Sequence, residues 1–149
     1  MEAIIFIGIQ SAGKSSCYRQ YFLDTHIRIN LDMLKTRHRE KIIFQACLEA
    51  KQGFVVDNTN PTIEDRSRYI QPAKAKGFRV LAYYFQSSLA ECKQRNNQRP
   101  HKQVVPMVGL LATHKKLVFP DLKEGFDDIY IVKTGDNYSF KIERINHES

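Results

Sequence analysis

Short apolar runs alternate along the chain with longer segments of helical periodicity. The first run, residues 3–7, is rich in β-branched side chains and stops at Gly8, which is typical of a strand buried on both faces of a parallel sheet. Similar runs predict four further strands, at residues 26–30, 54–56, 79–85 and 129–132. Helical spacing and boundary residues predict helices over 15–22, 34–52 and 61–73, from Ser87 or Ser88 to near Arg99, and from Pro106 onward.

This alternation is the pattern of βαβ units, in which helices cover both faces of a mainly parallel sheet. We expect one α/β domain over residues 1–149, because the chain shows no internal repeat, low-complexity segment or linker. Within residues 34–52, apolar positions 42, 43, 46, 47 and 50 predict the face that packs on the core. The tail, residues 138–145, alternates apolar and polar positions and fits either an edge strand or a loose helix.

The composition is that of a folded protein, since 42% of the 149 residues are hydrophobic and 26% are charged. No apolar run approaches the roughly 20 residues that cross a bilayer, and the N-terminus lacks a secretory pattern, so we expect a cytoplasmic protein. The 3 cysteines and 5 histidines show no spacing typical of a disulfide framework or a transition-metal site. The net charge of +7 favours a polyanionic substrate such as nucleic acid, although solubility alone also explains it.

One motif indicates phosphate chemistry. Residues 8–15, G-I-Q-S-A-G-K-S, match G-x-x-x-x-G-K-[ST] and lie between an expected strand and an expected helix, which is the context that this motif requires. In such a loop, backbone N–H groups surround the β-phosphate, Lys14 reaches the β- and γ-oxygens, and the Ser15 hydroxyl ligates Mg²⁺. We therefore predict that ATP and Mg²⁺ bind here. The residues expected to bind the nucleotide are Gly8, Ser11, Ala12, Gly13, Lys14, Ser15 and Ser16.

Two aspartates follow expected strands, at the edge of the sheet where open α/β folds bind ligands. Asp57 ends the apolar run 54–56 and is our second candidate ligand for Mg²⁺, although a cap of the turn into residues 58–60 is the alternative. Asp32 follows the run 26–30 and suits a general base that accepts the proton of an incoming hydroxyl. On local pattern alone, Asp32 is explained equally well as the N-cap of the next helix.

The segment from about 87 to 105 is polar and basic, and we expect it to form a small helical lid. Arg95 and Arg99 are four residues apart and so share one face of a helix. Arginines on a lid can stabilise charge on a transferring phosphoryl group and stack on adenine. The spacing is also compatible with a solvated surface helix.

Together these residues resemble the kinase domain of the polynucleotide 5′-hydroxyl kinases, which occurs in a bacteriophage enzyme and in the animal polynucleotide kinase 3′-phosphatase. The resemblance covers most of the chain and rests on the phosphate loop and three further stretches, 29–32, 55–61 with 65–70, and 119–126. The D-N-T-N-P stretch that runs into R-x-R-Y-I is especially similar to the animal enzyme. The D-x-D-G-T motif of the animal phosphatase domain does not occur here, so the resemblance implies a kinase alone.

The resemblance implies a P-loop fold with a five-stranded parallel core, and it assigns roles to several residues. Asp32 takes the place of the family's general base, and one of the two lid arginines takes the place of the family's own. Arg66 and Arg68 fall in a segment near the family's active site. Lys35 stands where the phage enzyme has an arginine, so a point charge replaces a two-pronged donor near the oligonucleotide. The catalytic residues expected on this basis are Lys14, Asp32, Arg66, Arg95 and Arg99, and the acceptor-binding residues are Asp32, Lys35, Arg66 and Arg68.

These features lead to three hypotheses for function. The first is an ATP-dependent kinase that phosphorylates the 5′-hydroxyl of a DNA or RNA end, which the basic charge and the resemblance favour. The second is a P-loop kinase for a metabolite, nucleoside or antibiotic hydroxyl, which requires a closed acceptor pocket in place of an open basic channel. The third is a nucleotide-binding regulator without acceptor chemistry, which does not explain why a base accompanies the metal ligands.

Overall fold

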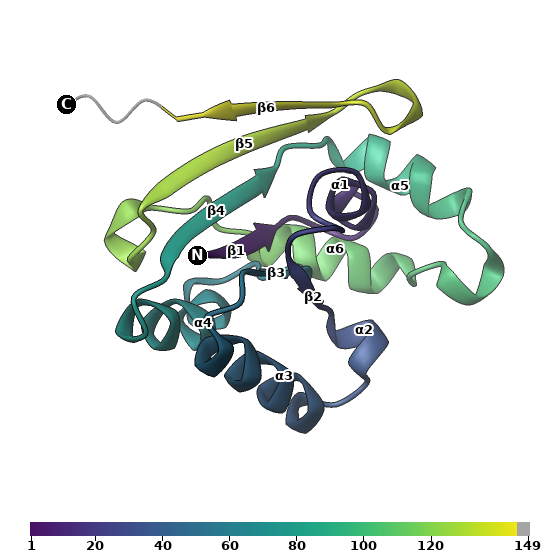
Figure 1. Cartoon of the computed structure of the whole chain (residues 1–149). Coiled ribbons are helices and arrows are strands. Elements are labelled where there is room, and N and C mark those ends of the chain that lie inside the picture. Colours follow the sequence, from purple (N-terminus) through teal and green to yellow (C-terminus); the bar gives the residue numbers. More distant parts are fainter. Residues whose placement is uncertain (146–149) are drawn as a thin grey trace.

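A six-stranded sheet forms the centre of the molecule in the computed structural model, which describes residues 1–145 (Figure 1). The strand order is β2-β3-β1-β4-β5-β6. The first five of these strands are parallel, and β6 runs antiparallel to β5 at one edge. The strands are β1 Glu2–Ile7, β2 Ile27–Ile29, β3 Phe54–Val56, β4 Arg79–Phe85, β5 Asp128–Thr134 and β6 Phe140–Arg144.

Helices connect the strands, and side chains that accept backbone N–H groups mark where several of them begin. Thr36 caps α3, Ser88 caps α5, and Thr62 forms a reciprocal capping box with Asp65 at the start of α4. The α-helices are α1 Lys14–Tyr21, α2 Leu31–Leu34, α3 Arg37–Ala50, α4 Ile63–Ala75, α5 Leu89–Asn97 and α6 Met107–Lys116. Short 3₁₀ turns are η1 His101–Gln103, η2 Leu122–Glu124 and η3 Asp136–Tyr138.

Alternate residues of the central strand β1 pack into two separate hydrophobic layers. Ala3, Ile5 and Ile7 belong to the layer that α3 and α4 cover. Ile4 and Phe6 belong to the layer that α1, α5 and α6 cover. The sheet is therefore buried on both faces, and the expected α/β fold with a five-stranded parallel core is confirmed.

The helix expected over residues 34–52 is interrupted near its start. Lys35 follows α2 with φ 75°, a left-handed conformation that ends the helix. Thr36 then begins α3, because its hydroxyl accepts a hydrogen bond from the N–H of Arg39 over 3.1 Å. The one expected helix is thus the short α2 followed by the longer α3.

The face of α3 that meets the sheet was predicted only in part: Cys47 is buried and Ile43 packs partly against the core, as expected. Positions 42, 46 and 50 are exposed, whereas Glu40, Phe44, Cys47 and Leu48 are buried. Two overlapping faces of this helix both carry apolar residues at helical spacing, and the face with Phe44, Cys47 and Leu48 is the one that is buried. The Phe44 ring meets Phe54 and Tyr69 edge-on, with ring centroids 5.5 and 5.4 Å apart.

The tail that left two alternatives open is an edge strand. Residues of β6 pair with β5 in an antiparallel register, in which Ile142 lies opposite Val132. The expected domain boundaries, 1–149, include residues 146–149, which lie outside the described residues.

The described residues include neither a helix that could cross a bilayer nor a cluster of three metal-ligating side chains. Within residues 1–145, no helix combines the length and the apolar character that crossing a bilayer requires. No three His, Cys, Asp or Glu side chains in that part of the chain are grouped so that they could hold a metal ion. The three cysteines, Cys17, Cys47 and Cys92, are free and buried.

Candidate active site

The phosphate loop, residues 8–15, leaves the carboxyl end of β1 and leads into α1. Close packing on β4 and β5 explains its two glycines. A Cβ at Gly8 would lie 2.9 Å from Cβ of Phe85, and a Cβ at Gly13 would lie 2.9 Å from Oγ1 of Thr134. Gly13 also has φ 98°, and Thr134 donates a hydrogen bond to the carbonyl of Ala12 over 2.8 Å. The loop is therefore held against the ends of two strands.

Lys14 is held over its own loop. Its ammonium donates hydrogen bonds to the carbonyls of Gly8 and Ile9, over 2.9 and 2.7 Å, and the residue is only 9% exposed. Burial lowers the pKa of Lys14 to about 8 from its ordinary value near 10.5, while the carboxylates of Asp57 and Asp32 act in the opposite direction. Both aspartates that the sequence singled out therefore act electrostatically on the lysine of the loop.

Ser15 and Asp57 are in direct contact. The Ser15 hydroxyl donates to Oδ2 of Asp57 over 2.9 Å, and Asp57 is 2% exposed. Asp57 thus faces the phosphate loop and not the turn into residues 58–60, which was the alternative. Hydroxyl and carboxylate oxygens are the ligands that Mg²⁺ prefers, so this pair fits the expected metal. When bound, Mg²⁺ would supply positive charge to the β- and γ-phosphate oxygens.

Asp32 lies in α2, exposed to solvent, and it caps neither adjacent helix. Asn30 caps α2 by accepting a hydrogen bond from the N–H of Met33 over 2.9 Å, and another residue caps α3. Two further bonds tie α2 to the end of β3. The Asn30 amide donates to the carbonyl of Asp57, and the N–H of Leu31 donates to the side chain of Asn58 over 2.8 Å. These bonds hold α2, and with it Asp32, next to the end of β3, and the Asp32 carboxylate acts electrostatically on Lys14.

The D-N-T-N-P stretch connects three parts of this edge of the sheet. The carbonyl of Thr59 accepts a hydrogen bond from the N–H of Gly8 over 3.0 Å, and the Asn60 amide donates to the carbonyl of Phe6 over 2.8 Å. Asn60 adopts φ 44°, a left-handed conformation that asparagine tolerates better than most residues. The stretch therefore holds the start of the phosphate loop as well as α2.

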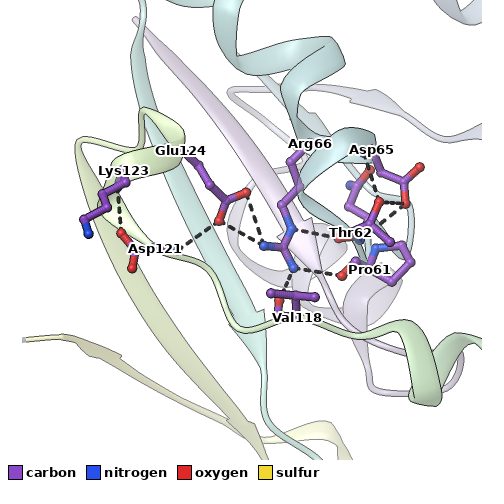
Figure 2. Close-up of polar contacts among 9 residues, drawn as sticks. Pro61, Thr62, Asp65, Arg66, Val118, Asp121, Lys123 and Glu124 are labelled. Carbon is purple, nitrogen blue, oxygen red and sulfur yellow. Dashed lines mark hydrogen bonds and ion pairs between the residues drawn. The ribbon is translucent and has the colours of Figure 1, made fainter.

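Arg66 lies inside the protein, and Figure 2 shows its polar contacts. It is 0% exposed, and each nitrogen of its guanidinium has a partner. Nη1 pairs with Glu124 over 3.0 Å, Nε donates to the carbonyl of Asn60 over 2.9 Å, and Nη2 donates to the carbonyls of Pro61 and Val118. Burial lowers the pKa of Arg66, and Glu124 opposes that shift. These contacts favour a structural role over the catalytic and acceptor-binding roles that the resemblance implied.

Lys35 and Arg68, the other expected acceptor contacts, are both exposed. Lys35 follows α2 directly, so it lies close to Asp32 in the chain. Arg68 lines a hollow of about 440 Å³ between α3 and α4. This hollow is lined by residues of the two helices and by none of the phosphate loop. Lys35 therefore lies three residues after the expected base in the chain, whereas Arg68 lies in a separate groove between two helices.

Both candidate arginines of the lid reach the phosphate loop at the same residue. Arg95 donates to the carbonyl of Ser11 over 3.3 Å, and Arg99 donates to its hydroxyl over 3.3 Å. Arg95 has further partners in Ser87, Glu91 and the carbonyl of Thr134. The positive charge of Arg99 also contributes to lowering the pKa of Lys14. Arg95 is thus anchored by several groups, whereas Arg99 brings its charge toward the lysine of the loop.

Two residues of this edge, Arg28 and Glu40, were missed by the sequence reasoning. Arg28 of β2 contacts both Ser15 and Asp57, and the alternation of residues 26–30 indicated only that it lies on the polar side of a strand. Glu40 is 2% exposed and accepts hydrogen bonds from Asn58 over 3.0 Å and from the Tyr69 hydroxyl over 2.8 Å. Nothing in the spacing of α3 distinguishes Glu40 from an ordinary surface glutamate.

Gln10, in the middle of the loop, is also tied to a distant element. Its amide donates to the Thr113 hydroxyl of α6 over 3.1 Å. Among the side chains that the structure describes, its Oε1 is the one buried oxygen or nitrogen without a hydrogen-bond partner. A buried acceptor of this kind is costly, which makes Gln10 a position where a bound hydroxyl or water would be stabilised.

Two curated relatives carry names that match the resemblance seen in the sequence. A bifunctional polynucleotide phosphatase/kinase of Schizosaccharomyces pombe is 28% identical over 135 residues, which cover 86% of this chain and 32% of that protein. A putative bifunctional polynucleotide phosphatase/kinase of Acanthamoeba polyphaga mimivirus is 31% identical over 138 residues, which cover 88% of this chain and 33% of that protein. The chain thus spans about a third of the length of these relatives.

Fold and family agree with the geometry of the loop. A solved gluconokinase from Sinorhizobium meliloti is 17% identical and matches with a TM-score of 0.60 over 89% of this chain and 82% of that one. At that identity the likeness concerns the fold alone. Residues 4–118, which include the phosphate loop, α2 and the lid, match the AAA_33 family, described as an AAA domain. With its phosphate loop on a mainly parallel sheet, the chain therefore belongs to the AAA_33 family of P-loop domains.

Proposed function

We propose that this chain is an ATP-dependent kinase that transfers the γ-phosphoryl group to the 5′-hydroxyl of a DNA or RNA end. The observation that carries the proposal is the grouping of three chemical functions at one edge of the sheet. Lys14 lies on the phosphate loop, Ser15 and Asp57 form a pair of oxygen ligands, and Asp32 lies in α2, which is bonded to the end of β3, and acts electrostatically on Lys14. These are the functions that phosphoryl transfer to an alcohol requires.

Each of these residues has a separate role in the phosphoryl transfer. The N–H groups of the loop and the Lys14 ammonium hold the β- and γ-phosphates, and their attraction strengthens as negative charge develops in the transition state. Asp32 accepts the proton of the attacking hydroxyl as its oxygen approaches the γ-phosphorus in line. Its exposure leaves this carboxylate accessible to a large acceptor. Arg99 supplies the positive charge of the lid, because Arg95 is already held by several partners.

The polynucleotide acceptor is supported by the two relatives named as polynucleotide phosphatase/kinases and by the net charge of +7. A strand of nucleic acid beyond the reacting end carries phosphates that exposed basic side chains can bind. The exposed candidates are Lys35 after α2, Arg68 in α4, and Lys115 and Lys116 in α6. Such remote contacts position the hydroxyl, so they raise the rate as well as the affinity.

The test compares a 5′-hydroxyl oligonucleotide with its matching 5′-terminal nucleoside as acceptors. We expect a higher kcat/KM for the oligonucleotide, and we expect that advantage to shrink as salt rises, because counterions are released from each bound phosphate. The affinity for ATP, measured in parallel by calorimetry, should be less sensitive to salt. Equal or better use of the nucleoside would assign the chain to the small-molecule kinases instead. Binding of ATP without phosphorylation of any hydroxyl would favour the regulator.

A further inference from the structure

Arg28 contacts both of the side-chain oxygens that are expected to bind Mg²⁺, those of Ser15 and Asp57. Its Nε donates to Oδ2 of Asp57 over 2.8 Å, and its Nη2 donates to Oγ of Ser15 over 2.9 Å. The Ser15 hydroxyl in turn donates to that same Oδ2 over 2.9 Å. The three side chains therefore form a closed triangle of charge-assisted hydrogen bonds.

We propose that Arg28 is the resident cation of this site: it holds Ser15 and Asp57 in the metal-free protein and competes with Mg²⁺ for the same two oxygens. The inference rests on the proposed function, since it accepts Ser15 and Asp57 as the magnesium ligands. It makes Arg28 a residue that sets how much Mg²⁺ the nucleotide needs in order to bind.

The competition follows from the atoms involved. One of the two acceptor lone pairs of Oγ of Ser15 already accepts the N–H of Arg28, so a divalent cation bound to that oxygen would lie close to the guanidinium. Oδ2 of Asp57 accepts hydrogen bonds from both Ser15 and Arg28, so a cation that binds this oxygen competes with those bonds. A guanidinium and Mg²⁺ in contact with one pair of oxygens would also repel each other at short range. Arg28 must therefore withdraw when the metal arrives.

The surroundings of Arg28 allow its guanidinium to move away from Ser15 and Asp57. Its side chain is 27% exposed, whereas that of Asp57 is 1% exposed, so the arginine is the partner that can reach solvent. Its guanidinium also lies 6.0 Å from the centroid of the Tyr18 ring. The ring is itself held in place, because the Tyr18 hydroxyl donates to the carbonyl of His26 over 2.6 Å. Arg28 can therefore leave the two oxygens without any rearrangement of the core.

The charge balance explains why a cation is kept there at all. A carboxylate as buried as Asp57 is destabilising unless a positive charge compensates it. Arg28 provides that compensation in the free protein, and the metal with its nucleotide provides it in the complex. Tight binding of free Mg²⁺ is disfavoured as a result, because the attraction of the ion to the two oxygens is offset by the loss of their bonds to Arg28.

The experiment measures metal binding without turnover. Mn²⁺ is titrated into the complex of the protein with ADP, and the loss of the free-ion EPR signal reports binding. We expect Arg28→Gln to bind Mn²⁺ about tenfold more tightly than the unchanged protein or better, which is the scale of losing charge-assisted hydrogen bonds from a competitor. Arg28→Lys keeps a cation without the fork, so its affinity should fall between the two. Lys76→Gln removes one exposed positive charge near the opposite edge of the sheet and should leave the affinity unchanged.

A second measurement tests the structural half of the inference. Without metal or nucleotide, Arg28→Gln should melt below the unchanged protein, because Asp57 loses its compensating charge. Saturating Mg²⁺ and ADP should then raise its melting temperature by more than they raise that of the unchanged protein. Arg28→Lys, which retains the charge, keeps the comparison available if the glutamine variant folds poorly.

The outcomes separate this inference from the proposed function. Equal or weaker Mn²⁺ binding by Arg28→Gln would overturn the competition while leaving the metal ligands and the kinase proposal in place. Failure of every protein to bind Mn²⁺ in the presence of ADP would overturn the metal assignment to Ser15 and Asp57, and the role of Arg28 with it. Failure to phosphorylate an oligonucleotide, with Mn²⁺ bound as expected, would count against the acceptor alone.

Discussion

Among the described residues, the carboxylate of Asp32, the proposed general base, makes no contact that stabilises the fold. Within residues 1–145 its carboxylate accepts no hydrogen bond that would explain its presence structurally, and Asn30 and Thr36 supply the caps of the neighbouring helices. A carboxylate that is exposed, is not a cap and lies beside a phosphate loop is a candidate for function before stability. Its replacement should therefore separate catalysis from binding and from folding.

We expect Asp32→Asn to lower kcat by about 10²- to 10⁴-fold, the usual contribution of a general base, with little change in ATP affinity or melting temperature. The measurements are single-turnover phosphorylation, calorimetric binding of ATP and thermal unfolding. Asp24→Asn, at another exposed aspartate, is the matched control and should retain activity. A lower affinity for ATP, or normal turnover in the Asp32 variant, would show that the carboxylate serves the phosphates or the fold.

At the scale of elements, Arg66 joins α4 to the segment that precedes β5. Its guanidinium bridges the carbonyls of residues 60 and 61, at the end of the D-N-T-N-P stretch, to Val118 and Glu124 (Figure 2). The side chains of Arg66 and Glu124 are 0% and 5% exposed. Removing one member of such a pair leaves the other charge buried without a partner, which is the costly change.

Arg66→Met should therefore lower the free energy of unfolding by about 3–5 kcal/mol, as measured by urea denaturation. Joint replacement of Arg66 and Glu124 by methionine should recover part of the loss, because no charge is then left without its partner. Arg68→Met, two residues away and exposed, should change stability by less than about 0.5 kcal/mol. A stable Arg66→Met protein that has lost only its activity would instead support the catalytic role that the resemblance implied.

At the scale of the whole molecule, the three thiols report on the two hydrophobic layers and on the lid. Cys47 lies in the layer under α3 and α4, and Cys17 and Cys92 lie in the other. Burial raises the pKa of Cys17 to about 12 and also raises that of Cys47 and Cys92. At neutral pH the folded protein therefore holds all three as unreactive thiols.

We expect no thiol to react rapidly with DTNB at pH 8 in the folded protein, and all three to react in urea along the same curve as the loss of helical circular dichroism. The pH dependence follows from the raised pKa values. Since the folded state holds these protons more tightly, their contribution to stability is complete below the ordinary thiol pKa near 9 and is lost as pH rises toward 12. Early labelling of Cys92 alone would show that α5 opens without the rest of the molecule.

Much of this fold could be inferred locally. The five parallel strands were expected from short apolar runs, since a strand buried on both faces needs little beyond its own composition to be recognised. The phosphate loop is also local: its glycines, Lys14 and Ser15 are consecutive in the chain, and the turn between strand and helix brings them together. The position of Asp57 at the end of β3 follows from the same reasoning, because parallel strands bring their carboxyl ends to one edge.

Other features were settled by contacts between distant parts of the chain. In the sequence, Arg66 cannot be distinguished from an exposed helix residue such as Arg68. Only the contact with Glu124, 58 residues later, shows that Arg66 is the buried one of the two. Likewise, Arg28 becomes a competitor for the metal only because β2 pairs with β3 and brings it to Asp57. The sequence by itself therefore specifies those chemical groups of the site that neighbouring residues in the chain supply. Long-range packing decides which charges those groups meet, because burial and pairing depend on residues that no local pattern connects.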